Sequence, residues 1–133
     1  MNITILYGGT STEHKISIQT GLAIAEAING RYNLDMINLD SEIYHSPHLL
    51  LDTDLVFNAL HGGDGENGNI QSFMDLHQIQ YTGSGAKACK IAMDKNITKL
   101  IAKSVGIPTP NWVLLKRNVN NGMQLQDNNS LKF

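Results

Sequence analysis

Cysteine, excess charge of one sign and long apolar runs are all scarce in this sequence. Its single cysteine, Cys89, excludes a disulfide within the chain and fits a reducing compartment. Ten basic and twelve acidic residues leave a net charge of −2, which gives no reason to expect nucleic acid or a membrane surface as a partner. No apolar run is long enough to cross a bilayer, and the start MNITILYGG lacks the features of a signal peptide. We therefore expect a cytoplasmic protein.

The chain does contain enough apolar residues, 41% of 133, for one domain with a core. Short apolar runs alternate with segments of helical periodicity. This alternation predicts an α/β fold with a doubly wound, mostly parallel sheet and helices on both faces, as in Rossmann-like domains. The expected strands are residues 3–7, 32–39, 54–60, 79–85 and 111–116, the expected helices are 17–28, 70–77, 86–92 and 94–105, and 41–51 is ambiguous.

Glycine-rich loops follow three of the expected strands, after Tyr7, Leu60 and Tyr81. If these strands are parallel, the three loops lie at one edge of the sheet, beyond the carboxyl ends of the strands. Ligands of open α/β folds bind at that edge. The polar and weakly patterned stretch from 118 to 133 lies apart from these loops, and we expect it to be a linker.

Glu13 has two interpretations. The sequence Thr10-Ser-Thr-Glu13 fits a capping box, in which Thr10 caps a helix and Glu13 reaches back to its amide. Alternatively, the Glu13 carboxylate holds a cationic group at the edge of the sheet. The cap is the commoner arrangement for this pattern, and one side chain can serve both purposes. His14, on the same turn, is expected to be solvated or to assist the cap.

The loop HGGDGENG, which begins at His61, is the most specific motif. Four glycines in eight residues cost backbone entropy that a plain connection would not require. His61 with Asp64 and Glu66 nearby could handle protons or ligate a metal, but the loop could also be a flexible connection with a helix-capping acid. The pair His45 and His48 has no third ligand in its neighbourhood and Pro47 between its members, so we assign no metal site to this chain.

Sequence motifs for a phosphate-binding site are weaker than the motif that begins at His61. The turn at Gly8 and Gly9 lacks the spacing of a dinucleotide-binding fingerprint, and the chain has no P-loop sequence. These glycines allow the backbone to approach a ligand or simply form a tight turn. The YTGSG segment could cup a phosphate with successive amides. Lys95 stands near an expected helix start, where a lysine opposes the helix dipole and hints at an anionic ligand, although a solvated lysine is commoner.

Four segments taken together resemble the N-terminal part of bacterial D-alanine–D-alanine ligases. They are YGGTSTEHKIS, HGGDGENGNIQS, YTGSGAKACKIAMDKNITK and GIPTPNW, in this order and with similar spacing. The resemblance covers the chain up to Trp112. It implies a three-domain ATP-grasp enzyme that joins two D-alanines for peptidoglycan through a D-alanyl phosphate, with ATP and Mg²⁺ as cofactors. It also implies a homodimer for the full-length protein.

The resemblance also implies roles for individual residues. The acid that matches Glu13 holds the ammonium of the first D-alanine, and the histidine that matches His61 lies beside that substrate, so both are expected to act in catalysis and substrate binding. Gly9 is expected to contact the substrate, and the lysine that matches Lys95 contacts ATP. One departure is Asn67, which stands where the family loop usually has an aspartate.

Most ATP contacts, the Mg²⁺ carboxylates and the oxyanion-stabilising arginine of the family lie beyond the region that this chain matches. We therefore expect residues 1–117 to be the N-terminal substrate-binding domain and 118–133 to be a linker toward a central ATP-grasp domain. The chain alone is expected to be inactive. Two alternatives remain: a non-catalytic module for a small ligand or for dimerisation, and a nucleotide-binding enzyme of unrelated chemistry, against which the missing phosphate motifs argue.

Overall fold

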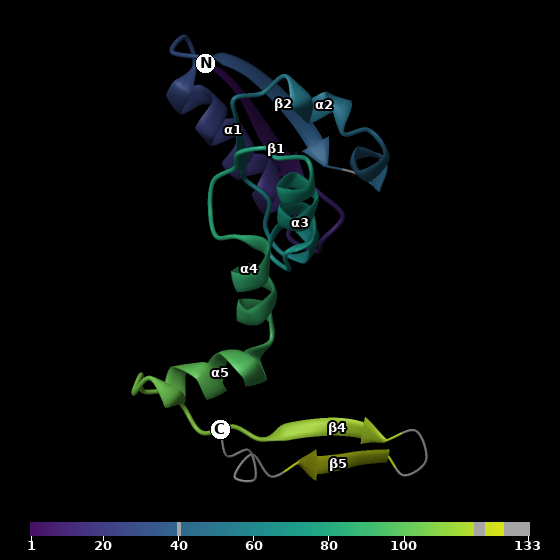
Figure 1. Ribbon diagram of the computed structural model, residues 1–133, viewed down its shortest axis with the longest axis vertical. Helices are drawn as coiled ribbons and strands as arrows, with labels where there is room; N and C mark the ends of the chain where they lie inside the picture. The colour runs from purple at the N-terminus through teal and green to yellow at the C-terminus, as the bar shows by residue number, and fades with distance from the viewer. Residues whose placement is uncertain (40, 119–121, 127–133) are drawn as a thin grey trace. The chain divides into compact units, whose positions relative to one another are not determined.

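Three parallel strands form the centre of the first part of the molecule. The computed structural model describes residues 1–39, 41–118 and 122–126. Strand β1 (Asn2–Gly8) lies between β2 (Asn33–Leu39) and β3 (Leu55–Asn58), and both neighbours run parallel to it. Next to β3, Tyr81 pairs with Val56 in a single parallel bridge. The strand order β2-β1-β3 places the end of β1 beside the end of β3. Figure 1 shows β2 next to β1, with α1 beside them.

Helices cover both faces of this sheet. Side chains of β1 alternate between the faces, as they must in a strand. Ile3 and Ile5 pack with the apolar side of α1 (His14–Ile28), while Leu6 lies in a second core with Val56 and residues of later helices. That second core includes Ile43 and Leu50, from η1 (Ser41–His45) and α2 (His48–Leu51), and Ile70 and Met74, from α3 (Asn69–Leu76).

The chain divides into two compact units after Met93. The first unit ends with α4 (Ala86–Met93), and the short turn η2 (Gly63–Gly65) precedes α3 within it. The second unit contains α5 (Lys95–Ser104) and an antiparallel pair of strands, β4 (Leu114–Asn118) and β5 (Gly122–Gln126). In it, the indole of Trp112 donates to the Asn96 side chain at 2.9 Å.

The α/β fold class predicted from the sequence is confirmed, and the helices lie close to their expected positions. Asp94 caps α5, because its carboxylate accepts from the amides of Asn96 and Ile97. One expected strand was wrong, because residues 79–85 form only the bridge at Tyr81. The strand expected at 111–116 is present as β4, shifted toward the C-terminus, and it pairs with β5 in a separate sheet.

The expected linker, residues 118–133, is partly described. Asn118 and Gly122–Gln126 belong to the β4–β5 pair, and the assignment of 118–133 as a linker stays a prediction. The other positions of that segment lie outside the described residues. The assignment of 1–117 as a domain stays a prediction.

Gly21 allows α1 to approach the sheet closely. A Cβ atom at this position would lie 2.6 Å from the Cβ of Tyr7, which is too close for two carbon atoms. A helix residue other than glycine would therefore push α1 away from β1.

We expect Gly21→Ala to destabilise the chain by about 1–2 kcal/mol, because the clash outweighs the gain of about 1 kcal/mol that alanine gives in a helix. Urea unfolding would measure the change. Ala23→Gly, at an exposed position of the same helix, provides the matched control for helix propensity. A gain in stability for Gly21→Ala equal to the loss for Ala23→Gly would contradict the close approach.

Candidate functional site

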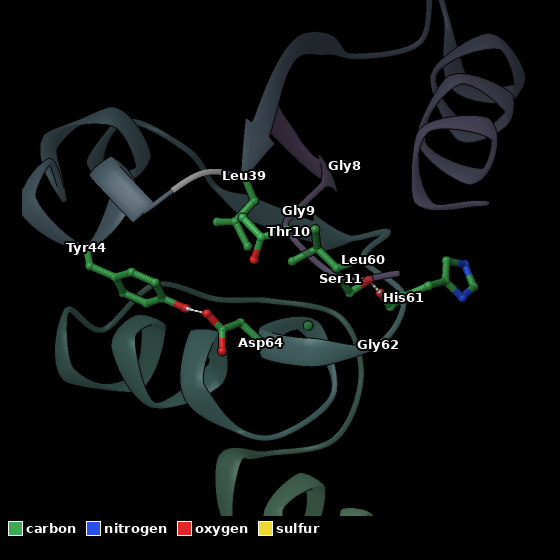
Figure 2. A pocket seen from close by; sticks show the side chains of 11 residues that line it. Gly8, Gly9, Thr10, Ser11, Leu39, Tyr44, Leu60, His61, Gly62 and Asp64 are labelled. Carbon is green, nitrogen blue, oxygen red and sulfur yellow. Dashed lines mark hydrogen bonds between the residues drawn. The ribbon is translucent and has the colours of Figure 1, made fainter. Parts of the chain in front are cut away.

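A cavity of about 80 Å³ opens at the carboxyl edge of the parallel sheet. Figure 2 shows the loops that form it: one follows β1, and the other follows β3. Tyr44 and Leu39 complete its wall. The lining residues of the two loops are 8–11, 60–62, 64 and 65. The first two glycine-rich loops predicted to share one edge therefore do so.

The two glycines after β1 are required by their backbone conformation. Gly8 and Gly9 have φ angles of +77° and +82°, in the left-handed region that other residues rarely adopt. A Cβ atom on Gly8 would also collide with the side chain of Asn38. Gly9, predicted to contact a substrate, lines the cavity, and its carbonyl oxygen accepts a hydrogen bond of 2.6 Å from Nδ1 of His14.

The capping box predicted for Glu13 was wrong. Helix α1 begins at His14, so Glu13 is itself the N-cap residue, and its carboxylate makes no capping hydrogen bond. The reason is Ser11, whose hydroxyl accepts from the Glu13 amide at 3.1 Å and donates to the carbonyl of His61 at 2.6 Å. The local turn formed by Ser11 delays the helix and leaves the exposed Glu13 side chain available for a ligand.

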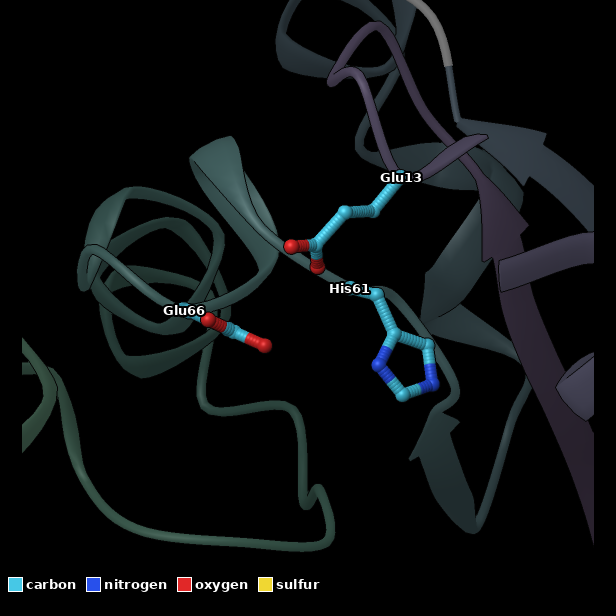
Figure 3. Close-up of side chains that lie close together, drawn as sticks. All are labelled: Glu13, His61 and Glu66. Carbon is cyan, nitrogen blue, oxygen red and sulfur yellow. The ribbon is translucent and has the colours of Figure 1, made fainter. Parts of the chain in front are cut away.

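His61 is half-buried and held at both its backbone and its ring. Its carbonyl accepts from Ser11, and Nε2 of its ring lies 3.0 Å from the Thr20 hydroxyl on α1. The other side of the ring faces Glu13 and Glu66 (Figure 3). One ligand atom from each of these three side chains lies within 4.8 Å of the others. The structure thus brings two of the predicted site residues, Glu13 and His61, together with Glu66.

Asp64, which the sequence placed beside His61 as a possible partner, has a structural role instead. Its carboxylate accepts hydrogen bonds from Tyr44, at 3.1 Å, and from the side-chain amides of Asn67 and Asn69, at 3.1 and 2.8 Å. Partial burial opposes ionisation of Asp64, but the three donated hydrogen bonds outweigh it and hold the pKa of this carboxyl below its usual value. Burial, with a smaller contribution from Asp64, raises the pKa of the Tyr44 hydroxyl well above its usual range.

The hydrogen bonds of Asn67 explain why the loop tolerates asparagine at this position, where the family usually has an aspartate. Its side-chain nitrogen donates to Asp64, and its side-chain oxygen accepts from the Asn69 amide at 2.9 Å. An aspartate could accept from Asn69 but has no donor for Asp64. The amide is therefore well suited to this position.

Lys95 lies in the second unit, as the first residue of α5. The other sequence candidates do not join Glu13, His61 and Glu66. Within the part of the chain that the structure describes, His45 and His48 belong to no group of three metal-ligating side chains. Cys89 is half-buried, and its thiol donates to the carbonyl of Ser84.

Sequence reasoning missed Thr20 and did not choose between Asp64 and Glu66. A signal for Thr20 was present: Ser17 and Thr20 are polar residues three positions apart, on the side of α1 that faces the sheet. Ser17 is completely buried, and its hydroxyl donates to the carbonyl of Ala59 at 2.9 Å. Polar residues on a buried helix face usually bind a specific partner.

The fold and this edge define a Rossmann-like α/β domain with a polar site beyond its strands. Comparison with known proteins relates it to one family. The family model described as "D-ala D-ala ligase N-terminus" matches residues 43–84. The D-alanine–D-alanine ligase of Fusobacterium nucleatum is 45% identical over 111 residues, which cover 83% of this chain and 39% of the relative. That of Coprothermobacter proteolyticus is 41% identical over 114 residues, covering 85% of this chain and 38% of the relative.

Solved structures agree. The D-alanine–D-alanine ligase from Bacillus anthracis complexed with ATP matches 95% of this chain and 48% of its own, with a TM-score of 0.80 and 29% identity. The ligase from Coxiella burnetii has a TM-score of 0.76 and 26% identity, over 92% of this chain and 47% of its own. The predicted resemblance is confirmed: this chain corresponds in sequence and fold to the N-terminal part of the D-alanine–D-alanine ligases. It spans about 38% of the length of the curated relatives.

None of the described helices has the combination of length and apolar character needed to traverse a bilayer.

The hydrogen bonds to Asp64 predict an acid-sensitive loop. Because its folded pKa lies below the ordinary value of 3.8, ionised Asp64 stabilises the fold fully above that value. The contribution is lost as pH falls through the lower folded pKa. Asp64→Asn should therefore be less stable than wild type near pH 7, and the difference should shrink below about pH 4.

Thermal unfolding of both proteins between pH 7 and pH 2 would test this. Tyr44→Phe removes one of the three donors and should lose a smaller part of the pH dependence. A constant difference between wild type and Asp64→Asn across this range would show that the Asp64 carboxylate does not stabilise the loop.

Proposed function

We propose that this chain provides the binding site for the first D-alanine of an ATP-dependent ligase that joins two D-alanines through a D-alanyl phosphate. The observation that carries the proposal is the Glu13 carboxylate. It lies at the edge where α/β folds bind ligands, it makes no capping hydrogen bond, and His61 lies beside it. An amino acid brings an ammonium group that a carboxylate binds through a charge-assisted hydrogen bond.

Each predicted residue has a part in this proposal. Glu13 binds the ammonium, and His61 lies on the other side of the same space, with its ring held by Thr20. Gly9 lines the neighbouring cavity, where its lack of a side chain allows the ligand to approach the backbone. Glu13 and His61 would thus touch the substrate in the reaction, as the family resemblance implies.

ATP and Mg²⁺ are the cofactors that the family implies, and this chain contributes little to either. Lys95 is the residue we propose for an ATP contact, through its ammonium group. The amides of Asn96 and Ile97 at the start of α5 already donate to Asp94, so they do not serve a phosphate. Glu13, His61 and Glu66 include an imidazole, whereas Mg²⁺ prefers oxygen ligands, so we assign no Mg²⁺ site here.

The rest of the proposal concerns the whole enzyme. Curated relatives are more than twice as long as the region matched here, and the further length would supply the remaining ATP contacts and the metal ligands. We place the reaction in the cytoplasm, as a step toward peptidoglycan, and expect the complete ligase to be a homodimer. D-Alanine is the proposed partner of this chain, with no role for nucleic acid or a membrane.

The first test is Glu13→Gln in a hybrid ligase, in which this chain replaces the matching N-terminal part of the Fusobacterium nucleatum relative. Loss of a charge-assisted hydrogen bond costs roughly 1.5–3 kcal/mol, so the KM for the first D-alanine should rise about ten- to a hundredfold while the KM for ATP stays unchanged. Thermal stability should be preserved, since the Glu13 side chain caps nothing.

Glu26→Gln removes an exposed glutamate elsewhere on α1 and is the matched control. If Glu13→Gln lowered the melting temperature and left both KM values unchanged, Glu13 would be a structural residue only.

The second test uses the 133-residue chain alone. We expect a cooperative thermal transition, because the first unit has cores on both faces of its sheet. We expect no D-alanine-dependent release of ADP, because acyl phosphate formation requires stabilisation of developing charge that Glu13, His61 and Lys95 do not provide. Millimolar D-alanine and ATP should leave the melting temperature unchanged, since an open pocket wall gains little from electrostatics in water.

Calorimetry with and without the ligands and a coupled ADP assay would measure both expectations. Purification from cells whose own ligase carries a removable tag controls for contamination. Turnover that survives removal of the host enzyme would contradict the proposal that this chain lacks the groups needed for catalysis.

A further inference from the structure

Glu13, His61 and Glu66 bring together the ligand types that suit zinc (Figure 3). One ligand atom from each side chain lies within 4.8 Å of the other two. Zinc binds both imidazole nitrogen and carboxylate oxygen, whereas Mg²⁺ and Ca²⁺ prefer oxygen alone. The two carboxylates also carry the two negative charges that balance Zn²⁺. The sequence predicted no metal site because Glu13 and His61 lie far apart in the chain.

The two glutamate side chains can move toward a common ion. Both are exposed, and within the part of the chain that the structure describes neither carboxylate makes a hydrogen bond or an ion pair. Zinc holds nitrogen and oxygen at about 2.0–2.2 Å, so its ligand atoms are roughly 3.3–3.6 Å apart. The limit of 4.8 Å admits this separation. Rotation of the exposed side chains supplies any further approach.

The histidine, in contrast, is held in one orientation. Nε2 of its ring lies 3.0 Å from the Thr20 hydroxyl, which can accept a hydrogen bond from that nitrogen. Histidines that ligate metals commonly donate their second ring hydrogen to such a partner, which fixes the ring and its tautomer. With hydrogen on Nε2, the lone pair is on Nδ1, on the side of the ring that faces the carboxylates. Thr20 is not itself a ligand, so its contact with His61 is a separate observation that points to a ligand on Nδ1.

We propose that Glu13, Glu66 and Nδ1 of His61 form a zinc-binding site, and that zinc bound there excludes the first D-alanine. Three protein ligands leave the fourth tetrahedral position of zinc to water. The metal site follows from the three side chains alone. Its inhibitory effect rests on the proposed function, because a Glu13 carboxylate that ligates zinc no longer binds the ammonium of the substrate.

Isothermal titration calorimetry of the 133-residue chain with zinc chloride tests the site without any activity. We expect one zinc ion to bind per chain, and no binding of magnesium chloride at equal concentration. Thr20→Val should weaken zinc binding about ten- to a hundredfold, the usual effect of removing a partner of a ligating histidine, and Thr20→Ser should restore it. His61→Gln and Glu66→Gln should each weaken it at least tenfold, because a lost ligand costs at least as much as a lost partner.

His48→Gln and Glu26→Gln are the matched controls, since both residues are exposed and neither belongs to the group of three. Both variants should bind zinc as wild type does. Absence of zinc binding, or equal affinities in wild type, His61→Gln and Glu66→Gln, would overturn the inference and leave the proposed function standing. A loss in His48→Gln as large as that in His61→Gln would place the metal elsewhere and would also overturn it.

Nitrogen NMR of the histidine rings provides a second measurement that needs only the wild-type chain. Zinc should shift Nδ1 of His61 while the hydrogen stays on Nε2. A shift of Nε2 alone, or of the rings of His45 and His48 in place of His61, would refute the proposed ligand.

The inhibitory effect is tested in the hybrid ligase at saturating Mg²⁺ and ATP. Zinc should raise the KM for the first D-alanine in proportion to its concentration and leave kcat unchanged, the pattern of competition. Glu66→Gln should require at least tenfold more zinc for the same rise. Zinc that binds the chain but lowers kcat without raising this KM would overturn the proposed exclusion of D-alanine. Failure of the proposed function would appear instead as an unchanged KM in Glu13→Gln without zinc, so the two failures are distinguishable.

Discussion

The hydroxyl of Ser11 joins the two loops on which the candidate site depends. It donates to the carbonyl of His61 and accepts from the amide of Glu13, so one side chain fixes residues from both loops. Gly62 is part of the same constraint. It has a φ of +66°, and a Cβ atom there would lie 3.2 Å from Ser11 Oγ and 3.3 Å from Glu13 Oε2. Gly62 and Gly63 of the second loop thus follow from how closely the first loop approaches it.

Most of the fold could be predicted from the sequence because its signals are local. Apolar runs followed by glycine-rich loops marked β1 and β3, and helical periodicity marked α5. The sequence could not predict whether residues 79–85 form a full strand, because that depends on how many of them pair with β3. They make a single bridge, between Tyr81 and Val56. The pairing of β4 with β5 also depends on partners rather than on pattern.

The candidate site was predicted in part, because strand ends can be recognised from the local sequence whereas side-chain directions and long-range contacts cannot. Glu13 and His61 follow strand ends, so topology alone placed them at one edge. The choice between Asp64 and Glu66 depends on the direction of each side chain in a short 3₁₀ turn, which the spacing of two residues does not reveal. The capping-box pattern at Thr10 was misleading because Ser11 could bind the next loop, a contact between residues fifty positions apart.

The position of β1 has a consequence for how the chain is made. This central strand is synthesised before both of its partners, and its last pairing partner is Asn58, in β3. On the ribosome, β1 must remain unpaired on one side until β3 has emerged, and the glycine-rich loops close only after that. Alone, β1 is a short apolar segment with two open edges, and an open strand edge can pair with another chain. The site at the carboxyl edge of the sheet therefore cannot form before β3 and the loop that follows it have been synthesised.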